Sequence, residues 1–184
     1  EIILLAYYIA TINIESIYHS IIKSNQYQPF NGSVLTDTFQ LYEQERDLIA
    51  DLLPDNSKKR TRQKKSPIKI IISNPPYSIG QKSENDNAQN IKYTNLDEKI
   101  RSTYGNNSQA VRQSALYDSY IRSFRWASDR LSDDGIIAYI TNANWIDNKA
   151  SDGLRKSLTE EFNKIYVLNL RGNQRTSGEL SRKE

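Results

Sequence analysis

The segment Asn74-Pro75-Pro76-Tyr77 combines residue types that could hold a flat group bearing an amine. Two consecutive prolines contribute no backbone N–H, fix their own φ angles, and force Asn74 and Pro75 into extended backbone. The Asn74 side chain and the Pro75 carbonyl are therefore rigid oxygen acceptors, and Tyr77 offers its ring as a stacking surface. Such a segment could hold both N–H bonds of an exocyclic amine and direct the nitrogen lone pair at an electrophile. This would be catalysis by positioning and electrostatics.

The residues before this segment, Ile68 to Ile72, form a β-branched run of the length expected for a buried central strand. Because Asn-Pro marks turns generally, the segment could simply end that strand. In open α/β sheets, however, ligands bind beyond the carboxyl ends of the strands. Two other predicted strand ends are also polar, at Asp37 and at Thr141-Asn142. We therefore expect an active site at this edge of the sheet.

Helices and strands are expected to alternate along the chain. The hydrophobic pattern predicts helices over 2–22, 39–53, 116–131 and 154–162, and strands over 34–36, 68–72, 136–140 and 165–170. The first helix is so rich in apolar residues that we expect it to be buried over much of its circumference against a sheet. Asp133-Asp134-Gly135 is predicted to be a turn. The alternation predicts an α/β fold with a mainly parallel sheet.

Two polar segments are predicted as loops, a basic loop over 55–67 and a long insert over 78–113. The first contains most of a cluster of positive charge: Lys58, Lys59, Arg60, Arg62, Lys64, Lys65 and Lys69. Such a cluster could attract phosphate backbones with a strongly salt-dependent affinity, or it could be a solvated linker. The insert could contact DNA or be disordered.

Composition excludes several kinds of site. The 184 residues are 37% hydrophobic and 26% charged, which suits one soluble globular domain. The absence of Cys excludes disulfides, thiolate metal sites and a cysteine nucleophile. His19 is the single histidine, expected to be a surface or packing residue, and we predict no metal. No apolar run approaches the ~20 residues of a membrane-spanning helix, and no secretory signal is visible, so we expect a cytoplasmic location away from membranes.

The run Ile72-Ser73-Asn74-Pro75-Pro76-Tyr77 resembles motif IV of the amino-group methyltransferases that use S-adenosylmethionine, most of all the N6-adenine DNA methyltransferases. Further segments, 116–120, 125–127, 135–142 and 168–173, are similar to large single-chain restriction-modification enzymes. In those enzymes a helicase-like translocase and a nuclease are fused to a methyltransferase and a target-recognition domain. The resemblance covers most of the chain. It implies a Rossmann-like fold that transfers methyl groups to N6 of a flipped adenine in double-stranded DNA, with the other domains of a parent chain as partners.

The resemblance also implies roles for single residues. Glu1 is similar to the motif II acid that binds the cofactor's ribose hydroxyls, and Asp37 to the motif III acid that accepts from the cofactor's adenine amine. Phe39 could pack on that adenine, and Asn74 would border both cofactor and base. Alternatively, Glu1 could be an ordinary acid at a helix start, Asp37 a turn residue and Phe39 a core aromatic. Trp145, just past a strand end, is expected to line the site.

The chain departs from the family at the glycine-rich motif I, because none of its seven glycines forms a Gly-x-Gly cluster after a strand. The first residue is Glu1 rather than Met, and we expect a piece of a longer protein. Residues 1–184 are accordingly predicted to form a partial methyltransferase domain, incomplete at its N-terminal end. We expect this piece to be inactive by itself, with weak or no cofactor binding.

Two other functions fit the same residues. Asn-Pro-Pro-Tyr also occurs in methyltransferases that modify the glutamine side-chain nitrogen of proteins. A non-catalytic module that positions DNA for other domains is the second alternative. The long polar insert and the basic stretch favour a nucleic-acid substrate over a protein.

Overall fold

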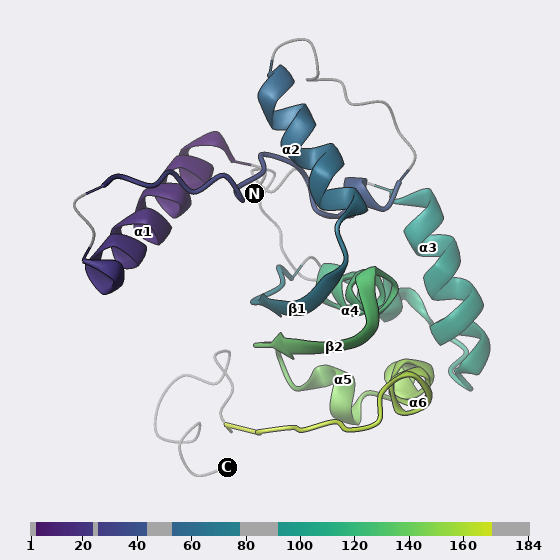
Figure 1. Ribbon diagram of the computed structural model, residues 1–184. Helices are drawn as coiled ribbons and strands as arrows, with labels where there is room; N and C mark the ends of the chain where they lie inside the picture. Colours follow the sequence, from purple (N-terminus) through teal and green to yellow (C-terminus); the bar gives the residue numbers. More distant parts are fainter. Residues whose placement is uncertain (1–2, 24–25, 44–52, 78–91, 171–184) are drawn as a thin grey trace.

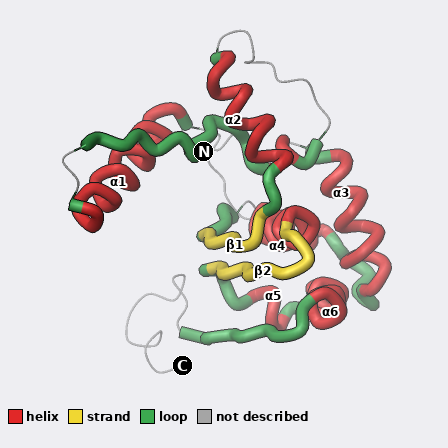
Figure 2. Tube along the Cα trace, viewed as in Figure 1, coloured by secondary structure: helices red, strands yellow, loops and turns green. Residues whose placement is uncertain are grey.

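The computed structural model describes residues 3–23, 26–43, 53–77 and 92–170. Within these residues, two strands and several helices form a mixed helix/strand fold (Figures 1 and 2). In chain order the elements are α1 (Leu4–Ile22), a 3-10 turn (Phe39–Leu41), α2 (Pro54–Lys65), β1 (Ile68–Ser73), α3 (Thr94–Ile100) with a π-helical extension (Arg101–Gly105), a 3-10 turn (Ser114–Tyr117), α4 (Ser119–Arg130), β2 (Leu131–Tyr139), α5 (Asn144–Asp147), a 3-10 turn (Lys149–Ser151) and α6 (Asp152–Glu161).

Strands β1 and β2 pair in parallel, as the alternation of strands and helices predicts. Their register runs from Ile70 opposite Ile136 to Ser73 opposite Tyr139. Before this stretch, Ile68 lies opposite Leu131, so β2 carries three extra residues at the irregularity. The predicted turn at 133–135 falls on this irregularity, inside the strand rather than before it.

The hydrophobic core lies where α3, α4 and α6 meet beside the sheet (Figure 1). Its fully buried side chains are Leu96, Ile100, Tyr104, Leu116, Ile121 and Leu154. Helix α4 is joined to the sheet by a hydrogen bond of 3.1 Å from the Tyr139 phenol to the Ser123 carbonyl. The predicted helices over 116–131 and 154–162 are thus confirmed, with α4 and α6 supplying apolar residues to one core.

Two predicted loops contain helices instead. Residues 55–65 of the predicted basic loop belong to α2, because Pro54 occupies the first turn of this helix, where its missing N–H costs nothing, rather than ending a helix. The basic residues of its last turn complement the helix dipole. In the predicted insert, residues 94–105 are helical, and residues 78–91 lie outside the described part of the chain. The predicted helix over 39–53 is reduced to the turn Phe39–Leu41 in its described part.

The predicted strands over 34–36 and 165–170 are wrong, since neither segment joins the sheet. Around Leu35 an amide side chain takes the place of a neighbouring strand. Asn56 of α2 accepts from the Leu35 N–H at 2.8 Å and donates to the Leu35 carbonyl at 2.9 Å. Residues 165–170 are exposed, and no strand of the described residues pairs with them.

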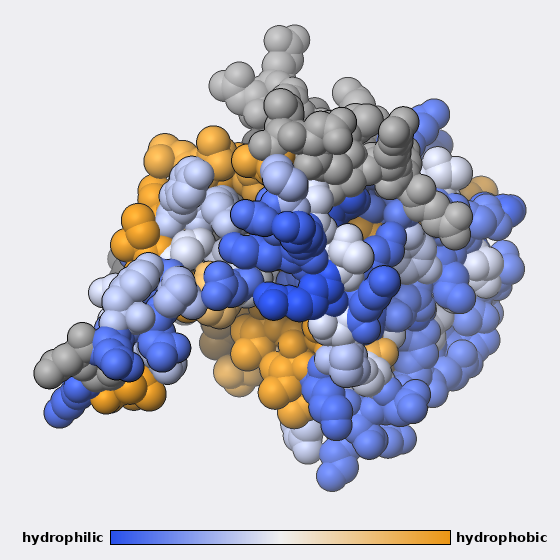
Figure 3. Space-filling model, turned by 45° about the horizontal axis from the view of Figure 1, so that its top comes forward, coloured by the Kyte–Doolittle hydropathy of each residue, from blue (hydrophilic) through white to orange (hydrophobic). Residues whose placement is uncertain are grey.

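The expected burial of the first helix and of β1 is also wrong. No residue of α1 is buried, and Ile9, Ile17 and Ile21 are among its exposed apolar side chains. In β1 only Ile71 is buried, because the two-stranded sheet is covered on one face by α4. Ile70, Ile72 and Ile136 are accordingly exposed, and Figure 3 shows apolar (orange) areas at the surface of the molecule. Among the described residues no helix has both the length and the apolarity that crossing a membrane requires.

Candidate active site

The carboxyl ends of β1 and β2 lie side by side, as their arrowheads in Figure 1 show. The Ile140 N–H donates to the Ser73 carbonyl at 3.1 Å, which continues the pairing to the last residue of β1. Asn74 and Thr141-Asn142 therefore leave the sheet at the same edge. This confirms that two of the three polar strand ends expected from the sequence are neighbours.

Asn74, Pro75 and Pro76 alternate in exposure. Asn74 and Pro76 are exposed, whereas Pro75 is among the fully buried residues. The rigid ring of Pro75 is thus anchored in the protein, and its position fixes where Asn74 leaves the strand. The Asn74 side chain is held at the surface of the sheet edge, where it can reach a ligand.

Tyr77 follows this edge in the chain and packs against a second aromatic residue, Tyr120. It is half-buried against the core, and its ring lies 5.6 Å from that of Tyr120 at an interplanar angle of 59°. Burial, with smaller contributions from Asp118 and Tyr77, raises the pKa of Tyr120 to about 12. The Tyr120 phenol is therefore neutral at physiological pH. Because Tyr77 is only half-buried, the exposed part of its ring is available for stacking.

Trp145 follows the end of β2 on the short helix α5. Its indole N–H donates to the Thr141 hydroxyl at 3.1 Å, and its ring lies 5.4 Å from Phe124. The Arg155 guanidinium donates to the Trp145 carbonyl at 2.8 Å. These contacts fix a half-buried indole beside the strand ends, where it was expected, while its lining role stays a prediction.

Asp37 lies in a turn rather than at a strand end, and both of its carboxylate oxygens accept hydrogen bonds. Oδ1 accepts from the Phe39 N–H at 2.9 Å, and Oδ2 accepts from the Tyr93 phenol at 2.7 Å. An ionised carboxylate has about four lone-pair sites, so each oxygen can accept a further bond. The arrangement holds the carboxylate in one orientation, which a site for an amine requires.

Of the two other residues predicted to bind the cofactor, the structure describes Phe39 but not Glu1. Phe39 is 7% exposed and packs edge-on against Tyr93, with ring centroids 5.1 Å apart. This is the position of a core aromatic, and contact of Phe39 with a cofactor stays a prediction. Glu1 lies outside the described residues. The core that contains Phe39 also touches Tyr77, so the two predicted site segments meet on one core.

The orientation of Asp37 depends on residues that the sequence analysis did not single out. Arg122 donates to both carboxylate oxygens of Asp97, at 2.8 and 2.9 Å, and its guanidinium lies 5.2 Å from the centre of the Tyr93 ring. Burial and the hydrogen bond to Asp37 raise the pKa of Tyr93, which keeps its phenol protonated as a donor. A chain of contacts thus runs from Asp97 through Arg122 and Tyr93 to Asp37.

Glu43 is a second residue that the sequence did not reveal. It is 4% exposed, and its carboxylate accepts from the Asn95 and Leu96 N–H groups at 3.0 to 3.1 Å. A carboxylate at the N-terminus of α3 is favourable because the free N–H groups and the helix dipole are positive there. Together with Tyr93, this contact fixes the segment of Asp37 to α3.

The described residues contain no group of three histidine, aspartate or glutamate side chains that could hold a metal ion. His19 lies on α1, where its Nε2 accepts from the Gln28 N–H at 3.3 Å and its ring stacks on Tyr27. These are packing contacts within one corner of the fold.

A model of the Eco57I restriction-modification methylase family matches residues 5–175. The chain belongs to this family. The resemblance inferred from the Asn-Pro-Pro-Tyr segment and its companions is thereby confirmed at the level of the family. A comparison of the chain with curated proteins gives no match.

Three of the solved structures similar to the chain are complexes with DNA or a DNA substrate mimic. A nuclease-deletion mutant of the Type ISP restriction-modification enzyme LlaGI, in complex with a DNA substrate mimic, is 50% identical with a TM-score of 0.89 over 99% of the chain. The DrdV-DNA complex is 41% identical with a TM-score of 0.85 over 98%. The ATP-dependent Type ISP enzyme LlaBIII bound to DNA is 47% identical with a TM-score of 0.78 over 86%. The chain, residues 1–184, covers 15%, 17% and 11% of those chains, respectively.

Proposed function

We propose that this chain is the methyltransferase part of a larger cytoplasmic restriction-modification enzyme, and that it transfers the methyl group of S-adenosylmethionine to N6 of adenine in DNA. Residues 1–184 would be a partial domain of the Rossmann-like methyltransferase fold, completed by other segments of that enzyme. The observation that carries the proposal is the sheet edge, where buried Pro75 anchors the chain between exposed Asn74 and half-buried Tyr77. The similar structures determined with DNA support the choice of substrate.

The target adenine must leave the duplex before it can reach this edge, which costs a few kcal/mol. Stacking on Tyr77 would offset part of that cost, since base–aromatic stacking is worth about 1–3 kcal/mol per base. The Asn74 side-chain oxygen and the Pro75 carbonyl would accept the two N6 hydrogens. Flipping and capture are thus assigned to one short, stiff segment.

With both hydrogens held, the N6 lone pair points away from Asn74 and towards the methyl group. S-adenosylmethionine, when bound, supplies that methyl group on a positively charged sulfur. N6 would form the new N–C bond as the S–C bond breaks, with the bonding pair left on the now neutral sulfur, and N6 would then lose its extra proton to water. Because the proton can leave after methyl transfer, no strong base is needed beside Asn74.

Asp37 has the chemistry to hold the cofactor's adenine amine. Its carboxylate is oriented by Tyr93 and by the Phe39 N–H, and it retains lone pairs for one more donor. Glu1 is proposed for the ribose hydroxyls, and Trp145 for the wall of the pocket. These assignments follow the family resemblance, supported by the fixed position of the Asp37 carboxylate.

The experiment that tests the proposal offers two substrates together. The full-length enzyme that carries this chain is incubated with methyl-labelled S-adenosylmethionine, mixed-sequence duplex DNA and a cell-protein extract. We expect the label in DNA. Label in protein would contradict the proposal and favour a glutamine-modifying enzyme. Bound cofactor without any transfer would favour a module that only positions DNA.

A further inference from the structure

Helix α2 carries the densest positive charge of the described residues. Its 12 residues contain Asp55 and six cations: Lys58, Lys59, Arg60, Arg62, Lys64 and Lys65. The helix does not depend on burial, because none of its residues is buried. Like charges this close repel one another, so a surface that keeps them together is suited to an anionic partner.

Several of the nearby cations are used by the fold. The Arg62 guanidinium donates from one nitrogen to the Asn31 carbonyl at 3.1 Å, and as a five-donor group it has further N–H bonds for a phosphate. The Lys64 ammonium donates to the Glu43 carbonyl at 3.1 Å. Arg130, from the end of α4, donates to the Gln63 carbonyl and, at 2.9 Å, to the Ser66 carbonyl, at the C-terminus of α2. These contacts attach α2 firmly to the rest of the molecule. A rigid basic helix presents its remaining charges in fixed geometry.

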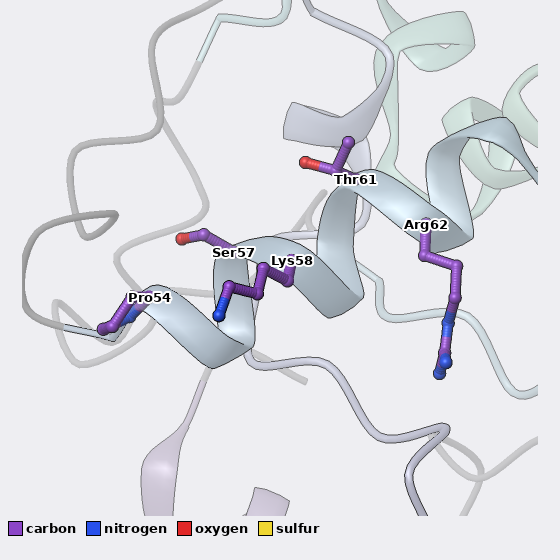
Figure 4. A pocket seen from close by; sticks show the side chains of 5 residues that line it. All are labelled: Pro54, Ser57, Lys58, Thr61 and Arg62. Atoms are coloured by element: carbon purple, nitrogen blue, oxygen red, sulfur yellow. The ribbon is translucent and has the colours of Figure 1, made fainter.

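Lys58, Arg62 and Lys65 are exposed and follow one another at intervals of four and three residues, which places them on one face of α2. Figure 4 shows Lys58 and Arg62 extending to the same side of the helix. Lys58 is ion-paired with Asp55 at 3.2 Å, but both side chains are more than three-quarters exposed. An exposed pair of this kind is worth at most about 1 kcal/mol, so Lys58 can readily exchange it for a phosphate.

Shallow grooves adjoin this face. One is lined by Pro54, Ser57, Lys58, Thr61 and Arg62 (Figure 4), and the next by Arg60, Thr61, Lys64 and Lys65. Hydroxyl groups next to cations along a groove are the chemistry that recognises phosphate oxygens. In Figure 3 the end of the molecule that carries α2 comes forward and shows a broad hydrophilic area.

This surface lies away from the candidate active site. Helix α2 leads through Ser66 and Pro67 into the start of β1, whereas Asn74 follows the end of that strand. At about 3.3 Å per residue, the six residues of β1 separate the two by roughly 20 Å. The basic face of α2 therefore cannot be part of the pocket around the target base.

We propose that the face of α2 formed by Lys58, Arg62 and Lys65 binds the phosphate backbone of duplex DNA at a distance from the flipped adenine. The choice of DNA as the polyanion rests on the proposed function. The face of α2 would be a second contact surface for DNA, independent of base sequence, in addition to the site around Asn74. Such a contact strengthens binding by counterion release and leaves the chemistry at Asn74 unchanged.

The test compares the full-length enzyme with the triple variant Lys58→Gln, Arg62→Gln, Lys65→Gln. DNA affinity is measured on one 30-base-pair duplex over a series of salt concentrations. Loss of three phosphate contacts should reduce the slope of log affinity against log salt by about 2.7, since each contact contributes about 0.9. The rate of methyl transfer at saturating DNA should stay within twofold of wild type.

A matched control removes the same charge elsewhere, with Lys149→Gln, Lys156→Gln and Lys164→Gln, three exposed lysines near or beyond α6. Its salt slope should equal that of wild type, and both variants should keep the wild-type melting temperature. The inference would be overturned if the α2 variant kept the wild-type salt slope. It would also be overturned if the α2 variant and the control lost the same amount of slope. If wild type fails to methylate DNA but its salt slope still depends on α2, the proposed function fails and the inference stands.

Discussion

The phenol of Tyr93 donates a hydrogen bond of 2.7 Å to Oδ2 of Asp37, across 56 positions of sequence. Tyr93 is 2% exposed, and its ring is held between Phe39 and the Arg122 guanidinium. Asp37 is the residue proposed to bind the cofactor's adenine amine. Its carboxylate is therefore oriented by a buried residue that itself is proposed to touch neither cofactor nor DNA.

Tyr93→Phe removes this donor and keeps the ring. We expect the affinity for S-adenosylmethionine to fall roughly three- to tenfold, because a hydrogen bond to a charged group is worth about 1.5–3 kcal/mol and part of that orients the carboxylate. Cofactor binding is measured by isothermal titration of the full-length enzyme.

Tyr42→Phe is the matched control. The Tyr42 phenol donates to Asp129 at 2.6 Å, so this variant removes an equivalent bond from a different carboxylate. It should lower stability to a similar extent but leave cofactor affinity at the wild-type value. Equal losses of affinity in the two variants would show that Tyr93 acts through general stability alone.

Tyr77→Ala tests the stacking surface. We expect the KM for DNA to rise about tenfold or more, because stacking on an aromatic ring is worth about 1–3 kcal/mol per base. The Kd for S-adenosylmethionine should change less than threefold, and Tyr77→Phe should behave like wild type in both measurements. Because Tyr77 also packs against Tyr120, equal losses in DNA and cofactor binding would point to a structural role for the ring.

The elements around the candidate site could be predicted because their signals are local. Ile68 to Ile72 and the run from Ile136 are β-branched, and α4 repeats its apolar residues at helical spacing, so sequence alone predicts them. The two strand ends are neighbours because parallel strands share an edge. The position of Asn74 therefore followed from sequence, whereas its contacts with cofactor and base remain predictions.

Other elements were predicted wrongly, some because long-range contacts decide them and one although its local signal is present. No strand forms over 34–36, because the Asn56 side chain rather than a neighbouring strand makes hydrogen bonds with the Leu35 N–H and carbonyl. Helix α3 was missed in a polar segment, although Leu96, Ile100 and Tyr104 recur every fourth residue and are all fully buried. That spacing was a readable signal. By contrast, the contacts of Glu43 and Tyr93 join distant segments and have no local signature.

Gly153 tests the packing of α6 against the π-helical extension of α3. A Cβ at this position would lie 1.9 Å from the Tyr104 carbonyl oxygen and 2.8 Å from the Ser108 nitrogen, both backbone atoms. Gly153→Ala should therefore lower the free energy of unfolding by about 3 kcal/mol, at the upper end of the usual overpacking cost.

Gly32→Ala is the control for Gly153. Its Cβ would meet the far end of the Phe30 ring at 2.5 Å, and that ring is 39% exposed and free to turn away. We expect a change of less than about 0.5 kcal/mol in thermal or urea unfolding, as is usual at surfaces. Equal destabilisation by the two substitutions would contradict the described packing of α6.

The central claim is that Asn74 at the end of β1 holds the N6 amine of adenine during methyl transfer. It is tested most directly by measuring N6-methyladenine in DNA treated with the full-length enzyme, by nucleoside analysis, for wild type, Asn74→Ala and Asn144→Ala. Asn144 is an exposed asparagine just beyond the end of β2, so its substitution controls for loss of an amide at the same edge. The account predicts N6-methyladenine from wild type and Asn144→Ala. Asn74→Ala should give at least a hundredfold less, where each factor of ten in rate corresponds to about 1.36 kcal/mol of activation free energy. Substantial N6-methyladenine from Asn74→Ala would contradict it.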